Sequence, residues 1–287
     1  MALNKIQESS DGTKKLIFDK GHIAVVIPTN SLSKKSMQGN KSQEILNANS
    51  EQSKDEKNTV CISCQVGCPV GCKFCYTGKL GFKCNLSPEE IFEQAKIAQD
   101  IIGKKIQSIV FMGMGEPTLN LKNVLEAAER IHKELPISYN RITISTSCLN
   151  TLDRLENIHF NIALSLHSPF DKVRKELIPG AASLREIISF TKKYLDKSNN
   201  KKYVMVEYSM IKGVNDSEKD LKKLISFKWP KKMLFNLIEF NPSGNFQKSD
   251  EEIVEHFKQE IIKAGWKCFI RKSRGSDIEA ACGMLDR

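Results

Sequence analysis

The chain has 287 residues, of which 40% are hydrophobic, and a formal net charge of +10. This length and apolar content suffice for one large domain with a substantial core, and no apolar run approaches the ~20 residues that a membrane-spanning helix needs. The positive charge favours a polyanionic partner, most simply nucleic acid, although the lysines are spread along the chain. The cysteine count of nine is odd and no apolar signal stretch opens the sequence, so we expect the reducing cytosol rather than a disulfide framework.

The first residues predict a β-hairpin over 11–28, in which Asp19-Lys20-Gly21 turns between two apolar runs. From Thr29 to Asn58 the composition changes to Ser, Asn, Lys, Gln and Glu, and such a stretch cannot bury enough apolar surface to offset its ordering entropy. We therefore expect two parts. Residues 1–58 would hold the hairpin and a flexible polar insertion (29–58), and residues 59–287 would form one larger domain.

Three cysteines follow a short apolar strand at 59–62. Cys68, Cys72 and Cys75 have the spacing CxxxCxxC. Three thiolates can hold three irons of a [4Fe–4S] cluster and leave the fourth iron open to another ligand. Structural zinc is the alternative, and it usually takes four ligands. Three further cysteines near this run could supply the fourth: Cys61, Cys64 and Cys84.

Strands and helices alternate after the cysteines. Ser87, with Pro88 and Glu90, predicts a capped helix that ends at Gly103. The later predicted strands are 107–112, 141–145, 160–166, 203–211, 234–240 and 267–271, and the predicted helices are 121–135, 152–157, 183–194, 218–227 and one capped by Ser249. Such alternation implies parallel strands covered by helices, in a barrel or an open doubly wound sheet. About six βα units are two short of a closed barrel, so we predict an α/β fold, a partial (βα)6 barrel with a small N-terminal β-hairpin.

In either architecture the active site lies at the carboxyl ends of the strands. Motifs rich in glycine or polar residues follow the predicted strands at this edge. In chain order they are the cysteine run, Gly113-Met114-Gly115-Glu116-Pro117, Ser145-Thr146-Ser147, Ser165-Leu166-His167 and Asn241-Pro242. A glycine-rich turn alone is often only a turn. Joined to the cysteine spacing, these motifs predict a single site.

At these residues the chain resembles the radical S-adenosylmethionine (SAM) superfamily, and the partial barrel is of the type that this superfamily has. In the superfamily, SAM binds the open iron through its amino and carboxylate groups, and an electron from the cluster cleaves SAM to a 5′-deoxyadenosyl radical. The resemblance implies that Cys68, Cys72 and Cys75 are the cluster ligands. It also implies that Gly115 and Glu116 lie near the ammonium group of SAM.

A narrower resemblance rests on seven motifs in order: CISCQVGCPVGCKFCYTG, FMGMGEPTLNL, ITISTS, ALSLHSP, EYSMIKGVND, NLIEFNP and RKSRGSDIEAACGML. Together they are similar to the radical-SAM ribosomal RNA (adenine-carbon-2) methyltransferases, the RlmN-type enzymes; a related family methylates carbon 8. The resemblance implies further SAM contacts at Ser145, Ser165, Leu166, His167 and Asn241. By themselves these would be ordinary strand-end residues.

The family's chemistry implies roles for two more cysteines. One SAM methylates a C-terminal cysteine, matched here by Cys282, and a second SAM supplies the radical that activates this methyl group for addition to the base. A resolving cysteine, matched by Cys61, then forms a disulfide and frees the product. The resemblance implies RNA as substrate, namely 23S ribosomal RNA with transfer RNA as a further target, and an electron donor such as flavodoxin or ferredoxin. Four cysteines receive no role: Cys64, Cys84, Cys148 and Cys268.

Two features depart from the family pattern. The family has an N-terminal helical domain that helps to grip RNA, whereas few residues precede the hairpin here. The family's proton-abstracting glutamate in the hairpin strand is matched by Ile23, and alternation should point the adjacent His22 to the opposite face. Glu44, Glu51 or Glu56 could approach from the polar insertion. The general base is therefore left open.

The sequence predicts a cytoplasmic radical-SAM enzyme that methylates an adenine ring carbon, most simply carbon 2. Three alternatives stay open. A paralogue could act on another RNA site or substrate, or could bind RNA after its catalysis has lapsed, and Ile23 supports both. Retention of Cys61 and Cys282 argues against the lapsed form. The third alternative is a zinc-binding nucleic-acid module.

Overall fold

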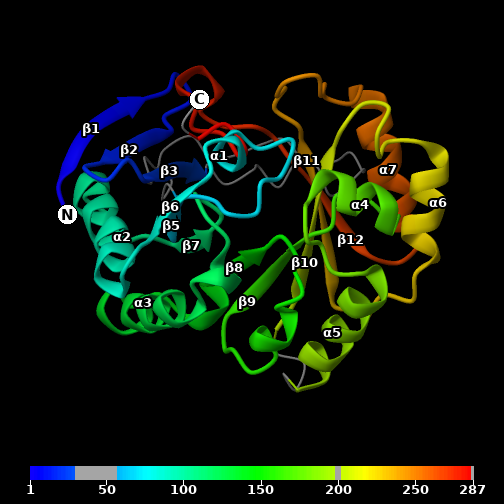
Figure 1. Cartoon of the computed structure of the whole chain (residues 1–287), viewed down its shortest axis with the longest axis horizontal. Coiled ribbons are helices and arrows are strands. Elements are labelled where there is room, and N and C mark those ends of the chain that lie inside the picture. The colour runs from blue at the N-terminus through cyan, green and yellow to red at the C-terminus, as the bar shows by residue number, and fades with distance from the viewer. Residues whose placement is uncertain (30–56, 198–201, 286–287) are drawn as a thin grey trace, which may run out of the picture.

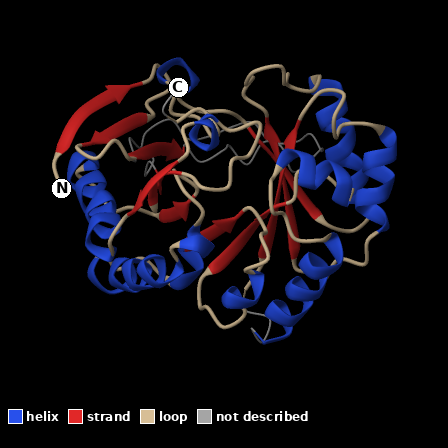
Figure 2. Cartoon of the chain, in the orientation of Figure 1, coloured by secondary structure: helices blue, strands red, loops and turns tan. Residues whose placement is uncertain are grey.

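The computed structural model describes residues 1–29, 57–197 and 202–285. A single curved sheet of ten strands runs through these residues, with helices outside it (Figures 1 and 2). In spatial order the strands are β1 (Leu3–Glu8), β2 (Lys14–Phe18), β3 (Ile23–Thr29), β4 (Lys57–Cys61), β7 (Ser108–Phe111), β8 (Ile142–Thr146), β9 (Asn161–Ser165), β10 (Val204–Met210), β11 (Met233–Glu239) and β12 (Lys267–Arg271).

All neighbours from β4 to β12 in this sheet pair in parallel. Because the two end strands of the sheet, β1 and β12, are not neighbours, the barrel stays open. The prediction of a partial α/β barrel is thus confirmed. Along the described ranges, no helix has both the length and the apolar content needed to cross a membrane.

The N-terminal strands β1 to β4 pair antiparallel and extend the same sheet. The predicted hairpin is confirmed as β2 and β3, joined by a turn with Gly21 at φ 86°. Strand β1 was not predicted because Lys5 and Gln7 are polar and the strand packs on one neighbour only. The bounds predicted for the polar insertion, 29–58, were too wide, because Thr29 pairs with Lys57 in the β3–β4 ladder. Its remaining part, 30–56, lies outside the described residues.

Five longer helices cover the outside of the sheet: α2 (Pro88–Ile102), α3 (Leu121–Glu134), α5 (Leu184–Lys197), α6 (Glu218–Ser226) and α7 (Glu251–Lys263). The structure adds two short helices that the sequence did not predict, α1 (Tyr76–Lys79) and α4 (Asp171–Leu177). The region predicted as a helix at 152–157 is a 3-10 turn, Leu152–Leu155. Other 3-10 turns are Pro117–Leu119, Tyr139–Arg141 and Ser276–Ile278. The main hydrophobic core lies between the helices and the sheet.

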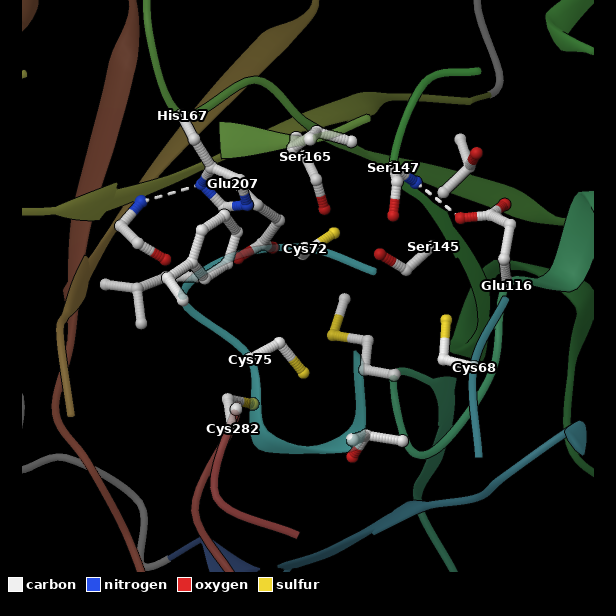
Figure 3. A pocket seen from close by; sticks show the side chains of 18 of the residues that line it. Cys68, Cys72, Cys75, Glu116, Ser145, Ser147, Ser165, His167, Glu207 and Cys282 are labelled. Atoms are coloured by element: carbon white, nitrogen blue, oxygen red, sulfur yellow. Dashed lines mark hydrogen bonds between the residues drawn. The ribbon is translucent and has the colours of Figure 1, made fainter. Parts of the chain in front are cut away.

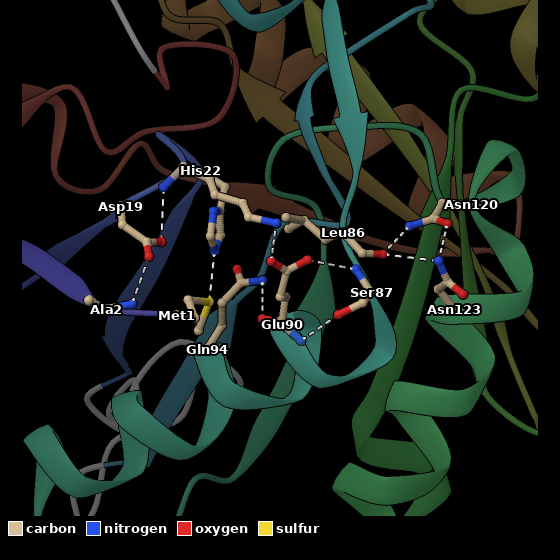
Figure 4. Close-up of polar contacts among 11 residues, drawn as sticks. Met1, Ala2, Asp19, His22, Leu86, Ser87, Glu90, Gln94, Asn120 and Asn123 are labelled. Atoms are coloured by element: carbon tan, nitrogen blue, oxygen red, sulfur yellow. Dashed lines mark hydrogen bonds and ion pairs between the residues drawn. The ribbon is translucent and has the colours of Figure 1, made fainter.

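Helix α2 begins as the sequence predicts (Figure 4). The Ser87 hydroxyl accepts from the amide of Glu90 at 3.2 Å, and the Glu90 carboxylate accepts from the amide of Ser87 at 2.9 Å. Glu90 also forms an ion pair with Lys20 in the hairpin turn, so the cap ties the helix to the sheet. The cap predicted for the last helix was misplaced. Asp250 precedes α7, and the Ser249 hydroxyl donates instead to Asp216 at 2.7 Å.

Candidate active site

One cavity opens at the carboxyl ends of the parallel strands and gathers most of the predicted site residues (Figure 3). Its lining includes the predicted residues Cys68, Cys72, Cys75, Gly115, Glu116, Ser145, Ser165, His167, Asn241 and Cys282. These residues come from five strand ends and from the C-terminal segment. Two predicted residues, Cys61 and Leu166, are described by the structure but are not part of this lining.

The three-cysteine run forms a loop that the protein itself holds in place. Two short paired strands, β5 (Gln65–Gly67) and β6 (Phe82–Asn85), clamp its ends, and the amide of Cys68 donates to the carbonyl of Gly81 at 3.0 Å. Inside the loop, the amide of Cys75 donates to the carbonyl of Cys72 at 3.1 Å. The loop is therefore ordered by hydrogen bonds of the chain.

The thiols of this loop are half-buried, and their ionisation needs a positive charge nearby. Burial raises the pKa of Cys68 to about 12, and it raises the pKa values of Cys72 and Cys75 above the ordinary thiol range as well. Cys75 also raises the pKa of Cys68, and Cys75 and Cys68 both raise the pKa of Cys72, because two thiolates repel each other at short range. Metal coordination would reverse this balance.

A buried arginine beside the loop favours an anionic group in the cavity. Arg174 is fully buried, and it donates to the backbone carbonyls of Ser165 and Leu166. Its Nε and Nη2 atoms have no partner among the described residues, and its charge acts on Cys72. Cys148 and Asp171 act on the Arg174 charge more strongly than Cys72 does, yet two of its nitrogen atoms stay unsatisfied, so thiolates and an anionic iron–sulfur group nearby fit this environment.

In Figure 3 the sulfur atoms of Cys68, Cys72 and Cys75 point from different sides into the same space. Within the described ranges, no three His, Cys, Asp or Glu side chains form a group that could hold a metal ion. The three thiols nevertheless line one cavity. They fit a multi-iron cluster, in which each thiolate binds a different iron.

The glycine-rich turn after β7 packs directly on the strand that precedes the cysteine loop. Gly115 has φ 101°, and a Cβ atom there would lie 2.6 Å from the Cβ of Gln65. A Cβ on Gly113 would lie 2.6 Å from the Oγ of Ser63. Both positions therefore require glycine. The turn brings the amide of Glu116 within 2.9 Å of the Gln65 side-chain oxygen.

Glu116 places a buried carboxylate in the cavity wall. Its Oε1 accepts from the amide and hydroxyl of Thr118 at 3.1 and 2.8 Å, and its Oε2 accepts from the amide of Ser147 at 2.7 Å. These bonds link the ends of β7 and β8 and fix the direction of the carboxylate (Figure 3). The result is a fixed acceptor with capacity for a cationic ligand group.

His167 is a neutral hydrogen-bond donor toward the cavity. Its Nδ1 accepts from the amide of Ser209 at 3.0 Å, so the ring proton is on Nε2. Burial, with the nearby charge of Arg174, lowers the pKa of His167 to about 3. The residue has φ 53° and its ring meets that of Phe74 edge-on. The backbone and the aromatic contact therefore set its orientation.

The C-terminal segment folds back onto the cysteine loop and brings Cys282 to the cavity. The amide of Tyr76 donates to the carbonyl of Gly283 at 2.9 Å, and the hydroxyl of Thr77 donates to the carbonyl of Leu285 at 3.1 Å. The Asn241 side chain donates to the carbonyl of Cys282 at 3.0 Å. Residues about 200 positions apart in the chain thus meet at one edge, and Cys282 lies beside Cys75 (Figure 3).

Cys61 lies just behind this edge, at the end of β4. It is buried in an apolar cluster with Ile23, Met114 and Leu285. Burial raises its pKa to about 12, the nearby Cys282 raises it further, and the charge of Arg271 opposes both. Cys61 and Cys282 are therefore close enough to interact electrostatically. All nine cysteines are free thiols in the structure.

Leu166 has a different position from the other predicted SAM contacts. Its side chain is fully buried in the main core. Its amide donates to the carbonyl of Glu207 at 2.9 Å, and its carbonyl accepts from Arg174. The residue thus supports the strand end that presents His167.

Three charged residues of the site were missed by the sequence reasoning: Arg174, Glu207 and Arg271. Glu207 lies in the otherwise apolar strand VMVEYSM, so a charged residue at a buried position was a signal that could have found it. Arg271 ends the last strand, at the catalytic edge of the sheet. Arg174 gave no such signal, because it lies on a short helix among other charged residues.

The hairpin strand has an apolar residue where a general base was sought. Ile23 is buried beside Cys61, and no carboxylate occupies this position. His22 points to the other face, as predicted. It stacks on Phe18, and its Nε2 lies 3.1 Å from the sulfur of Met1 (Figure 4). The carboxylates considered from the polar insertion, Glu44, Glu51 and Glu56, lie outside the described residues.

Comparisons with known proteins agree with this geometry. The family model of the Radical SAM superfamily matches residues 62–225. The dual-specificity RNA methyltransferase RlmN of Helicobacter hepaticus is 39% identical over 98% of this chain and 77% of that protein. The enzyme of the same name from a Sulfurovum species is 38% identical over 98% of this chain and 79% of that protein.

Solved structures show the same architecture. A radical SAM methyltransferase from Sphaerobacter thermophilus superposes with a TM-score of 0.83 at 30% identity, covering 99% of this chain and 81% of that one. Spore photoproduct lyase in complex with a dinucleoside spore photoproduct shares the fold alone, with a TM-score of 0.53 at 12% identity, covering 75% of this chain and 76% of that one. The chain therefore belongs to the RlmN family of radical SAM RNA methyltransferases, whose cofactors are a [4Fe–4S] cluster and SAM.

Proposed function

We propose that the chain methylates carbon 2 of an adenine in 23S ribosomal RNA, with transfer RNA as a further substrate, through an S-methyl group on Cys282. The observation that supports this most is the meeting of Cys282 with the cysteine-lined cavity and with Cys61. A methyl group on the Cys282 sulfur would lie at the cavity edge. The thiol of Cys61, which could release the methylated product, lies behind this edge of the cavity.

Cys68, Cys72 and Cys75 would hold the cluster, because their thiols line one cavity and Arg174 supplies a compensating charge. When bound, the cluster supplies the electron that cleaves SAM to its radical. The fixed carboxylate of Glu116 would accept from the ammonium group of SAM. The Nε2–H of His167 would donate to an oxygen of SAM.

Ser145, Ser165, Gly115 and Asn241 are proposed to complete the SAM site, since all four line the cavity. Asn241 has a second task in this arrangement. Its side-chain oxygen accepts from Ser273 at 2.7 Å and its amide holds the carbonyl of Cys282. It therefore couples the SAM site to the methyl carrier.

Two SAM molecules would serve each turnover. The Cys282 sulfur would first take the methyl group of one SAM and lose its thiol proton. The radical from the second SAM would then remove one hydrogen atom from this methyl group, and its carbon would bond to the ring carbon as the ring proton leaves and one electron returns to the oxidised cluster. The Cys61 thiolate then attacks the Cys282 sulfur. An S–S bond forms while the bond from sulfur to the transferred carbon breaks, and an external thiol reductant restores both cysteines. The apolar surroundings of Cys61 protect its thiol until that step.

The partners follow from this chemistry. The charge of +10 suits an RNA phosphate backbone. A one-electron donor such as flavodoxin or ferredoxin would reduce the cluster. Free buried thiols and an iron–sulfur group point to the cytoplasm as the location.

The direct test is a trapped intermediate. A Cys61→Ala protein incubated with SAM, reductant and RNA should accumulate a covalent protein–RNA adduct, because the resolving thiol is missing. The adduct should map to the C-terminal tryptic peptide that contains Cys282. The matched control is the Cys61→Ala, Cys282→Ala double variant, which should form none. Normal turnover by Cys61→Ala would contradict the proposal.

A second candidate function is supported by Ile23. The family's proton acceptor is replaced there by a buried isoleucine, and this favours a paralogue that acts on another RNA site or base carbon. Mass mapping of RNA from a deletion strain, with and without the restored gene, separates the two. A lost methyl group on adenine carbon 2 supports the first function, and a lost group elsewhere supports the second.

A further inference from the structure

The Arg271 side chain lies at the end of β12, beside Cys282, the proposed methyl carrier. Arg271 is the last residue of β12, and its Nη2 donates to the Sγ of Cys282 at 3.0 Å. Its Nη1 lies 3.5 Å from the sulfur of Met112. Among the described residues, Arg271 is the cationic side chain that donates a hydrogen bond to the sulfur of Cys282.

The guanidinium is held from behind by a buried carboxylate. The Oε2 of Glu207 lies 3.9 Å from Nη1 of Arg271, and Glu207 is almost fully buried. The side-chain amide of Asn236 donates to both Glu207 oxygens, at 3.1 and 3.0 Å. Asn236 and Glu207 are paired residues in the β10–β11 ladder. The chain Asn236–Glu207–Arg271 is therefore built on three adjacent strands of the sheet.

This arrangement suits the first chemical step. A sulfur that takes a methyl group from SAM forms one S–C bond while the sulfonium S–C bond of SAM breaks; the thioether that leaves keeps the electron pair, and the thiol proton passes to solvent. A thiolate is the better nucleophile, and a guanidinium beside it stabilises the negative charge. After methylation the neutral thioether is a weak acceptor, so the contact with Arg271 weakens and the methyl group is free to turn toward the cavity.

We propose that Arg271 is a positioning residue that orients and activates Cys282 as the methyl acceptor, and that Glu207 and Asn236 hold Arg271 in that task. The inference rests on the proposed function, because it assumes that Cys282 carries the methyl group. It adds a step-specific role: Arg271 serves the loading of Cys282 and not the cleavage of SAM.

The first test needs no cluster and no RNA. Cluster-free, reduced protein is treated with iodoacetamide for timed intervals, and the tryptic peptides of Cys282 and Cys84 are quantified by mass spectrometry, with Cys84 as the internal reference. Arg271→Met should slow alkylation of Cys282 at least about tenfold, the scale of a charge-assisted hydrogen bond. Arg271→Lys should restore part of the rate. Faster or unchanged alkylation would overturn the proposal, because Arg271 would then only shield the sulfur.

The matched control is Arg274→Met. Arg274 lies three residues further along the same segment and faces Asp11 at 3.9 Å. Its removal should leave the alkylation of Cys282 unchanged. Glu207→Gln should slow alkylation by a smaller factor than Arg271→Met, because the guanidinium stays but loses its anchor.

The second test separates this inference from the proposed function. Reconstituted protein is incubated with SAM, and methylation of the Cys282 peptide is followed beside cleavage of SAM to 5′-deoxyadenosine. In Arg271→Met the methylation rate should fall while cleavage under strong reductant persists. Equal methylation in the unchanged protein and the variant refutes the role of Arg271. Absence of methylation in the unchanged protein refutes Cys282 as carrier and, with it, the inference.

Discussion

The cysteine loop and the C-terminal segment present thiols to the same cavity in different electrostatic settings. The loop thiols are half-buried, Cys68 and Cys72 pack beside apolar residues such as Val70, and Cys75 raises the pKa values of both. Cys282 receives a hydrogen bond from the Arg271 guanidinium. The pKa values of the loop thiols lie above the ordinary range, whereas the sulfur of Cys282, the proposed carrier, accepts a hydrogen bond from a cationic side chain. The comparison teaches that the proposed cluster ligands and the proposed methyl carrier have separate electrostatic settings within one cavity.

The largest effect should follow from breaking the loop side of this comparison. Cys72→Ala removes one of three thiols, so we expect the cluster to be lost and SAM cleavage to fall to background. Iron content, visible absorption of anaerobic protein and 5′-deoxyadenosine formation measure this. The control is Cys84→Ala, on β6 at the end of the same loop. It should keep its iron content, its visible absorption and its 5′-deoxyadenosine formation. A brown, iron-loaded Cys72→Ala protein would contradict the assignment.

Breaking the carrier side should have a narrower effect. Cys282→Ala removes the methyl acceptor but no loop thiol, so RNA methylation should be lost while iron content and SAM cleavage persist. The two variants together test whether the thiols have separate functions. Loss of iron from Cys282→Ala would mean that Cys282 is a fourth ligand, and the carrier role would then fail.

His167 offers a smaller, graded change at the same cavity. In His167→Asn, the side-chain oxygen can replace Nδ1 as acceptor for the Ser209 amide, and asparagine tolerates the positive φ. The donor at Nε2 is lost. We expect KM for SAM to rise about fivefold, the effect of one neutral hydrogen bond, with iron content unchanged. An unchanged KM would show that Nε2–H does not bind SAM.

The sequence could predict the elements of the barrel and the order of its motifs, because helix caps and apolar strands are local signals. The capping box predicted at Ser87 forms, and Ser183 and Glu186 form another at the start of the helix predicted from residue 183. The placement of the motifs at strand ends could also be predicted, since parallel strands end at one edge. The resemblance, and not the spacing, drew attention to Cys61 and Cys282.

What the sequence could not predict depends on long-range packing. Arg271 and Glu207 are far apart in the chain and meet only because β10 and β12 flank β11. Arg174 is buried through a helix too short to give a periodic signal. Strand β1 is an edge strand with a polar sequence. Each depends on a neighbour that no local pattern specifies.

The smallest expected effect concerns the face of the hairpin that points away from the thiols. It tests whether a change on this face leaves the thiols unaffected. His22 faces helix α2 while its neighbour Ile23 faces Cys61. Burial lowers the pKa of His22 to about 4, although Glu90 and Asp19 oppose the shift. The unfolded chain binds this proton near pH 6.5, so it holds more protons than the folded chain between about pH 6.5 and 4. Stability should therefore fall as the pH drops through this window.

His22→Phe removes this proton-binding group and keeps an aromatic ring against Phe18. We compare urea unfolding at pH 7 and pH 5 in both proteins. The unchanged protein should lose about 2 kcal/mol more unfolding free energy than His22→Phe, as the linkage relation gives for a group that shifts from 6.5 to about 4. His167 contributes equally to the pH dependence of the unfolding free energy in both proteins, so its contribution cancels in the comparison. Equal losses would show that His22 is protonated in the folded state. The iodoacetamide reactivity of Cys282 should match in both proteins, because the two faces of β3 do not share their contacts.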